Sequence, residues 1–227
     1  GKIQFEIGVQ TTNTDALKAV DRKTNLDMVF YNTSKLREKG NIHVHLDLIA
    51  GLPLEDMDSF TESFNDVYNL EPHQLQLGFL KLLKGSKIRR EAHLHGYVFR
   101  DYPPYEILSN KYISFDDIAE LKGVEEIVER YYNTGRFAGT LKYIVDKLYH
   151  SYPYIFYRDF YRYNSGRGYM RRPVALNRLY DIIFDFVRDK FSQADIDAVN
   201  ELLKFDFLSC DKSGSLPANI TRTQPNG

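Results

Sequence analysis

Three segments in the first hundred residues alternate polar and apolar side chains, and this pattern limits the fold more than any other feature of the chain. The segments are Ile3–Gln10, Ile42–Ala50 and Gln74–Leu83. Because successive side chains of a strand point to opposite faces, each segment predicts a strand with one polar and one apolar face. The polar faces carry Gln4, Glu6, Gly8 and Gln10, then His43, His45, Asp47 and Ile49, then Gln74, Gln76, Gly78 and Leu80.

Helical patterns separate the three predicted strands. A short helix begins near Asn13 or Thr14, a second covers about Asp27–Lys39, and Met57–Asn69 has an amphipathic pattern. Strands connected through helices are parallel, with right-handed crossovers. An open parallel sheet is apolar on both faces, whereas a barrel can turn a polar face into its lumen. The sequence therefore predicts an α/β fold with about three parallel strands of a TIM-like barrel, which further strands must close.

The pattern changes near Phe99, after which we expect an all-α domain. Pro103-Pro104 forms a stiff connection, and five helices follow. They are predicted at Ser114 to about Tyr132, Arg136–His150, Tyr154–Tyr163, Pro173 to about Phe191, and Gln193–Leu208. We thus divide the chain into the later half of a barrel (1–98), a helical domain (99–210) and a disordered tail (211–227).

Composition excludes several classes of function. The 227 residues carry a net charge of −1, which argues against nucleic acid as the main partner. No run approaches the ~18 apolar residues of a membrane span, and no signal peptide is visible. The single cysteine, Cys210, cannot form an internal disulfide. We expect a cytoplasmic protein, and the strand-like start at Ile3 suggests a piece of a longer chain.

Candidate ligand contacts cluster where the predicted strands end, which is the catalytic end of a barrel. Gln10 closes the first strand, and Asp47 stands near the end of the second, before the turn Gly51-Leu52-Pro53. A Gln and an Asp at neighbouring strand ends suit the paired hydroxyls of a ribose. Arg22 suits a carboxylate, because its planar fork donates two parallel hydrogen bonds. Each residue alone is also compatible with a loop cap or a solvated strand end.

The combination of these residues resembles radical S-adenosylmethionine (SAM) enzymes. Glu6-Ile7-Gly8-Val9-Gln10, then Arg22, then Asp47-Leu48-Ile49-x-Gly51-Leu52-Pro53 is similar to the fourth and fifth barrel strands of that family, especially its coproporphyrinogen-dehydrogenase-like and cobalamin-binding branches. Residues Leu77–Ser86 resemble the sixth strand and its turn, although the Pro of that turn is missing. The segments Pro103–Glu106, Ser114–Asp116 and Tyr131–Phe137 resemble a helical domain found in cobalamin-binding members, some labelled as magnesium-protoporphyrin monomethyl ester oxidative cyclase-like.

The resemblance implies roles for five residues. Gln10 and Asp47 would bind the SAM ribose, Arg22 the methionine carboxylate, and Ile49 and Gly51 the adenine. The family also holds a [4Fe–4S] cluster on three cysteines and, in some members, cobalamin. This chain has only Cys210, which we predict to be a core cysteine, so it would ligate neither group. The prediction is an oxidoreductase- or methyltransferase-like enzyme part that is inactive without the preceding part of its parent.

Two other groups of residues support alternative functions. His43, His45 and Asp47 share one strand face, as in metal-dependent barrel hydrolases, but both histidines precede the catalytic end, and we predict no metal site. His93 and His95 are predicted to be surface residues. The run Tyr152–Arg172 mixes aromatic residues with five arginines, which suits a docking module for tRNA or an anionic substrate, or a helix with an aromatic core face and solvated arginines.

Free strand edges are the last expectation from sequence. A part-barrel of three strands leaves its first and third strands unpaired on one side, and such edges pair with other strands. We therefore expect the missing part of the parent chain as a partner, or self-association into a homodimer. The small-molecule substrate is not identified by the sequence.

Overall fold

A computed structural model describes residues 3–210, 216–218 and 220 of the chain. The chain divides into two compact units, Gly1–Glu125 and Glu126–Gly227, and each is considered by itself. The domain boundaries drawn from the sequence at 98 and 210 remain predictions. Most of the predicted disordered tail, 211–227, lies outside the described residues. Within the part of the chain that the structure describes, no helix is both long and apolar enough to cross a membrane.

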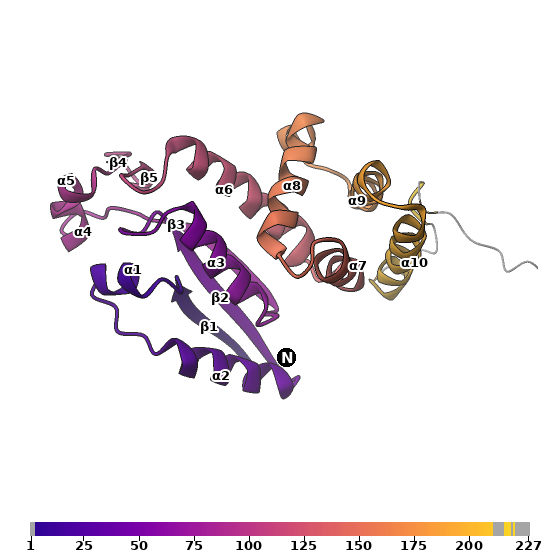
Figure 1. Cartoon of the computed structure of the whole chain (residues 1–227), viewed down its shortest axis with the longest axis horizontal. Coiled ribbons are helices and arrows are strands. Elements are labelled where there is room, and N and C mark those ends of the chain that lie inside the picture. The colour runs from indigo at the N-terminus through magenta and orange to yellow at the C-terminus, as the bar shows by residue number, and fades with distance from the viewer. Residues whose placement is uncertain (1–2, 211–215, 219, 221–227) are drawn as a thin grey trace, which may run out of the picture. The chain divides into compact units, whose positions relative to one another are not determined.

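The first unit is built on a parallel sheet in the order β1-β2-β3, which confirms the predicted α/β class (Figure 1). Its elements are β1 (Ile3–Gln10), α1 (Thr14–Ala19), α2 (Leu26–Glu38), β2 (Ile42–Ala50), α3 (Met57–Tyr68) and β3 (Gln74–Phe79). The helices begin where the sequence supplies caps. Asn13 accepts hydrogen bonds from the first turn of α1, Asn25 caps α2, and Asp56 forms a capping box with Ser59 at α3.

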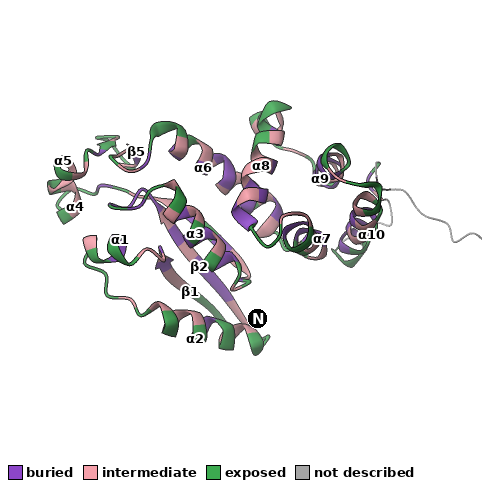
Figure 2. Ribbon diagram, viewed as in Figure 1, coloured by how far each residue is buried: buried purple, intermediate pink, exposed green. Residues whose placement is uncertain are grey.

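Strand register brings the predicted polar faces together. Gly8 pairs with Asp47, which pairs with Gln76, so these three residues form one row across the sheet. His45 pairs with Glu6 and Gln74 in the row before it. On the opposite face the side chains of β2 and β3 are almost fully buried, as the purple of β2 in Figure 2 shows. These side chains are Val44, Leu46, Leu48, Leu75 and Leu77.

The third strand is shorter than predicted because another segment pairs with its continuation. β3 ends at Phe79 rather than Leu83. The Ile107 N–H donates to the Leu80 carbonyl at 2.9 Å, and the Leu82 N–H donates to the Tyr105 carbonyl at 2.8 Å. The sequence did not predict this pairing, because the paired residues lie about 25 positions apart. Their side chains also show no alternation of polar and apolar types that would indicate a strand.

The rest of the first unit contains short elements. α4 (Lys87–Arg90) and α5 (Ala92–His95) follow β3, and β4 (Val98–Phe99) pairs antiparallel with β5 (Ile107–Ser109). The helix α6 (Phe115–Ile127) comes next. The chain after Phe99 is mostly helical, as predicted, and the exception is β5, which is too short to show a period in sequence.

The second unit is helical, as predicted. After α6 come the π-helical turn η1 (Val128–Tyr132), α7 (Ala138–Tyr143), the π-helical turn η2 (Ile144–Leu148), α8 (Pro153–Gly166), the 3₁₀ turn η3 (Tyr169–Arg171), α9 (Leu176–Lys190) and α10 (Gln193–Cys210). Its core is a set of aromatic rings in mutual contact, all fully buried: Tyr131, Phe137, Phe156, Phe160, Tyr180, Phe186 and Phe207.

Two residues of α10 differ from what their types suggest. Asp206 is only 6% exposed, and its carboxylate accepts hydrogen bonds from the Gly139 N–H, the Thr140 N–H and the Thr140 hydroxyl. It thus caps α7 from a distant part of the sequence. Cys210, predicted to be buried, is exposed. It is the last residue of α10.

Candidate functional site

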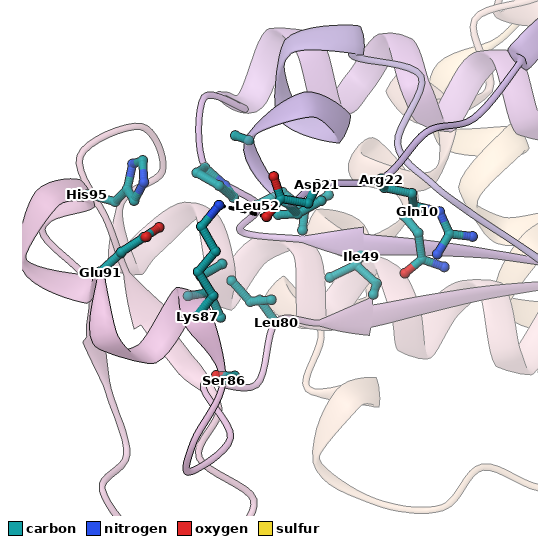
Figure 3. A pocket seen from close by; sticks show the side chains of 14 residues that line it. Gln10, Asp21, Arg22, Ile49, Leu52, Leu80, Ser86, Lys87, Glu91 and His95 are labelled. Atoms are coloured by element: carbon teal, nitrogen blue, oxygen red, sulfur yellow. Dashed lines mark hydrogen bonds and ion pairs between the residues drawn. The ribbon is translucent and has the colours of Figure 1, made fainter.

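Two cavities lie at the carboxyl ends of the parallel strands, and they share Gln10, Ile49 and Leu80 in their walls. The first has a volume of about 500 Å³ and the second about 380 Å³. Arg22 lines the first cavity and Asp47 the second. Four of the five residues predicted as ligand contacts are therefore brought together. Figure 3 shows Gln10 and Arg22 side by side, with Ile49 next to them on the adjoining strand.

Gln10 is held in an unusual backbone conformation. Its φ angle is 73°, in the left-handed region that non-glycine residues rarely adopt, and the register of β1 against β2 shifts between Gly8 and Gln10. Strained residues of this kind persist where surrounding contacts fix them, and they concentrate at binding sites. The shift turns the Gln10 amide back over Gly8.

Gly8 provides the space that Gln10 and Arg22 occupy. A Cβ atom at Gly8 would lie 2.4 Å from Gln10 Nε2 and 3.4 Å from Arg22 Nη2. Arg22 Nη2 also donates a hydrogen bond to the Gly8 carbonyl. The side-chain amide and the guanidinium therefore sit above a residue that has no side chain of its own, and both can reach a ligand in the first cavity.

Asp47 is partly buried beside a histidine. Its side chain is 30% exposed, and its Oδ1 lies 3.1 Å from His45 Nε2. Burial raises the pKa of Asp47, the adjacent His45 opposes that rise, and Glu6 adds to it. The carboxylate lines the second cavity next to Gln76 and Gly78 of β3.

The turn after β2 is fixed by backbone contacts. Gly51 has a φ of 89°, and its carbonyl accepts hydrogen bonds from the Tyr97 hydroxyl at 2.9 Å and from Asn110 Nδ2 at 3.2 Å. Gly51 does not line either cavity, whereas Leu52 and Pro53 line the first. Ile49 lines both cavities, and the adenine contacts of Ile49 and Gly51 both stay predictions.

A buried carboxylate that sequence reasoning missed stands behind this turn. Glu55 is 1% exposed, and the Thr11 hydroxyl donates a hydrogen bond to its Oε1. Ser63 Oγ of α3 lies 3.1 Å from Thr11 Oγ1, and it accepts a hydrogen bond from the Thr12 N–H at 3.0 Å. Burial raises the pKa of Glu55 to about 7, against the opposing hydrogen bonds from Thr11 and Ser63. The only sequence signal was an acidic residue between an apolar turn and a helix cap.

The outer wall of the first cavity comes from α4 and α5, and it is charged. Lys87 Nζ pairs with Asp21 Oδ2 at 2.6 Å, and Glu91 and His95 lie on the same wall (Figure 3). His93 is exposed, as predicted, and His95 is half-buried and lines the cavity. The helical spacing of Lys87, Glu91 and His95, four residues apart, could have placed all three on one face.

The histidines of β2 do not form a metal centre in the described structure. His43 stacks on His73 with ring centroids 4.9 Å apart, away from the His45–Asp47 pair. Among residues 3–210, 216–218 and 220, no group of three or more His, Cys, Asp and Glu side chains could hold a metal ion. One exposed cysteine does not fit the three thiolate ligands of an iron–sulfur cluster, so these residues do not supply such a site.

The arginines between Tyr152 and Arg172 are partly engaged by carboxylates. Arg167 pairs with Asp189 at 2.8 Å and stacks on Tyr163, with the guanidinium carbon 3.7 Å from the ring centroid. Arg158 lies 3.7 Å from Asp159. Because carboxylates face these two arginines, less positive charge remains for phosphate than the sequence count suggests.

The fold is that of an α/β protein with two adjoining cavities at the carboxyl ends of its parallel strands. A family model described as "Protein of unknown function (DUF4080)" matches residues 93–227, and the chain belongs to this family. The description gives no activity. The match covers the end of the first unit and all of the second.

Curated relatives add a second relationship. The chain is 31% identical over 101 residues to 2-(S-pantetheinyl)-carbapenam-3-carboxylate methyltransferase of Streptantibioticus cattleyicolor, and 29% identical over 99 residues to the cobalamin-dependent radical SAM methyltransferase TokK of Streptomyces tokunonensis. It is 26% identical over 98 residues to the oxygen-independent coproporphyrinogen-III oxidase-like protein HemZ of Bacillus subtilis. Each match covers 43% of this chain, but 14%, 14% and 20% of the respective relatives. Part of the chain is therefore distantly homologous to radical SAM proteins.

Proposed function

We propose that this chain contributes the SAM-binding half of a radical SAM enzyme. The observation that carries the proposal is the arrangement of Gln10, Arg22 and Asp47 around two adjoining cavities at the carboxyl ends of β1 and β2. Distant homology to radical SAM proteins over about 100 residues supports it. The whole protein would belong to the oxidoreductase- or methyltransferase-like members of that class.

Each part of SAM has a chemically suitable partner. Arg22 carries a planar donor fork for the methionine carboxylate, and it lies in the first cavity. Asp47 and the Gln10 amide can accept and donate hydrogen bonds to the two ribose hydroxyls. Ile49, Leu52 and Leu80 offer apolar surface for the adenine ring. Gly8 leaves room for the Gln10 and Arg22 side chains, and Gly78 lines the second cavity with no side chain of its own.

The chain alone would bind SAM without breaking it. Its single cysteine cannot provide the ligands of a [4Fe–4S] cluster, and we assign none of its residues to a cluster or to cobalamin. The chain spans a fifth or less of the length of the three relatives named above, so the remaining barrel strands would come from another part of the parent protein. We propose that this part, rather than a second copy, pairs with the free edge of β1, where Ile3 and Phe5 are about half exposed.

Equilibrium binding of SAM to the natural full-length protein tests the proposal. We expect Arg22→Ala and Asp47→Asn each to weaken SAM binding about tenfold or more, because each removes a charge-assisted hydrogen bond. Lys23→Ala is the matched control, since this neighbouring cation lines neither cavity. With the cluster reconstituted anaerobically, release of 5′-deoxyadenosine should fall in the same two variants. Unchanged SAM affinity in both would contradict the proposal.

A second function is favoured because the helical part has its own family match and its own core. The family match lies on residues 93–227, and residues 126–227 have an aromatic core of their own. We propose that this part recruits the substrate or a partner of the enzyme. Deletion of the helical unit should then leave SAM affinity unchanged while product formation is lost. Loss of SAM binding in a correctly folded deletion variant would contradict this role.

A further inference from the structure

His45 occupies a buried position between two carboxylates on the polar face of the sheet. It is 6% exposed. Its Nε2 lies 3.1 Å from Asp47 Oδ1, and its Nδ1 lies 3.9 Å from Glu6 Oε1. The three residues come from neighbouring strands, and β3 contributes the uncharged Gln74 opposite His45. The buried imidazole therefore lies between two carboxylates, and the Asp47 carboxylate is the nearer.

The contact with His45 gives the two carboxylate oxygens of Asp47 different surroundings. Oδ1 is buried and makes no hydrogen bond of good geometry, although the side chain as a whole is 30% exposed. A ligand in the second cavity can therefore reach the carboxylate only through Oδ2. Nε2 and Oδ1 are as close as hydrogen-bonded atoms but are not aligned as such, so the imidazole holds Oδ1 by contact.

The environment of Asp47 explains why such a partner is needed. An ionised carboxylate offers only acceptors to two vicinal hydroxyls, whereas the protonated form replaces one acceptor site by an O–H donor. Burial and the nearby Glu6 both raise the pKa of Asp47, which favours the protonated form, and His45 acts in the opposite direction. Without the imidazole, Asp47 would lose both the contact at Oδ1 and the neighbour that opposes the rise in its pKa.

We propose that His45 is a positioning residue of the ligand site: it fixes Oδ1 of Asp47 and directs Oδ2 toward the ribose hydroxyls of a bound adenosyl ligand. The inference rests on the proposed function and extends it to a residue that touches no ligand. It also gives the site a selectivity for ligands that carry both ribose hydroxyls.

His43 provides a matched control on the same strand. It lies two residues before His45 on the same face, but its ring stacks on His73 rather than on Asp47. Replacing either histidine by glutamine removes one imidazole from the polar face of β2. Only the replacement of His45 should alter the ligand contact of Asp47.

The test compares binding of SAM to the natural full-length protein and to four variants: His45→Gln, His43→Gln, Asp47→Asn, and the double variant of His45→Gln with Asp47→Asn. We expect His45→Gln to weaken SAM binding about tenfold, because the charged Asp47 carboxylate loses a neighbouring partner. His43→Gln should leave SAM binding unchanged. The double variant should bind no more weakly than Asp47→Asn alone, because His45 acts through Asp47.

A second measurement separates positioning from a general effect on folding. Adenosine and 2′,3′-dideoxyadenosine are used as competitors of SAM in wild type and in His45→Gln. Wild type should prefer adenosine, and His45→Gln should lose that preference while its affinity for the dideoxy compound stays the same. His45→Asn serves in the same assays if His45→Gln fails to fold.

The outcomes distinguish the two proposals. If Asp47→Asn weakens SAM binding but His45→Gln keeps wild-type affinity and preference for adenosine, the positioning role is overturned and the SAM site stands. If His45→Gln weakens both competitors equally, the residue is structural only, and the positioning role is again overturned. If Asp47→Asn leaves SAM binding unchanged, the proposed function itself fails.

Discussion

The Thr11 hydroxyl donates a hydrogen bond to the Glu55 carboxylate, and both residues are fully buried. Thr11 directly follows Gln10 at the end of β1, and Glu55 follows the turn that ends β2. The contact thus joins the ends of two neighbouring strands behind the first cavity. Ser63 of α3 adds contacts to both Thr11 and Thr12. This network accounts for the strained conformation of Gln10, because it holds the following residues in place.

Stability should fall as pH rises through the range in which Glu55 titrates. Its pKa is raised from 4.5 to about 7 in the folded protein, so the folded state holds a proton that the unfolded state has already released. Between these values the folded state binds more protons, and the free energy of unfolding decreases with rising pH by about 3 kcal/mol in total.

Urea unfolding at about pH 4 and about pH 8 measures this effect. Glu55→Gln cannot titrate, so the pH-dependent loss in wild type should exceed that in the variant by about 3 kcal/mol. Thr11 and Ser63 are unchanged in both proteins, and the other ionisable groups cancel in the comparison. An equal loss in the two proteins would show that folding does not raise the pKa of Glu55.

Gly8→Ala should weaken SAM binding, because the new Cβ would lie 2.4 Å from Gln10 Nε2 and must displace that amide. The φ angle at Gly8 is not in the left-handed region, so the backbone accepts alanine and the fold should persist. We expect a loss of affinity similar to that of Gln10→Ala, measured by isothermal titration calorimetry. Gly166→Ala is the control, since this glycine of α8 lines neither cavity and its added Cβ would meet no neighbouring side chain within 4 Å. An equal effect at Gly8 and Gly166 would contradict the interpretation.

Gly51→Ala should destabilise the protein by about 2 kcal/mol or more, because it combines backbone strain with a steric clash. Its φ is 89°, and a Cβ there would lie 2.7 Å from Ile107 Cδ1. Gly85→Ala separates the two contributions: its φ is 85°, but no atom lies within 4 Å of the added Cβ. Thermal unfolding should show the larger loss for Gly51→Ala, and shortening Ile107 to valine should recover part of it. Equal losses at the two glycines would leave strain as the sole cause.

The alternation of side chains made the three strands predictable, and the spacing of Gln10, Arg22 and Asp47 indicated one end of the sheet. In contrast, Glu55, His45 and His95 were not assigned to the site from sequence. Their roles depend on neighbours from other elements, such as Thr11 for Glu55, and no local pattern specifies those neighbours. The pairing of Ile107 with Leu80 was missed for the same reason. Periodicity reports which face a residue occupies, but not which distant residue lies opposite.

Asp206 in the helical unit also has a distant partner that no local pattern specifies, and it leads to the last prediction. The sequence places this aspartate on an otherwise apolar stretch of α10, yet it accepts three hydrogen bonds at the start of α7. Asp206→Ala would leave the Gly139 and Thr140 N–H groups without a partner, at a cost of about 2–3 kcal/mol. Asp195→Ala removes a half-buried carboxylate in the first turn of α10 that accepts hydrogen bonds only from the Ser192 and Tyr143 hydroxyls, and should cost only about 1 kcal/mol. Urea unfolding followed by near-ultraviolet circular dichroism, which reports the aromatic core, compares the two variants. If Asp206→Ala is no less stable than Asp195→Ala, the α7 amides have found other acceptors and the long-range cap is not needed.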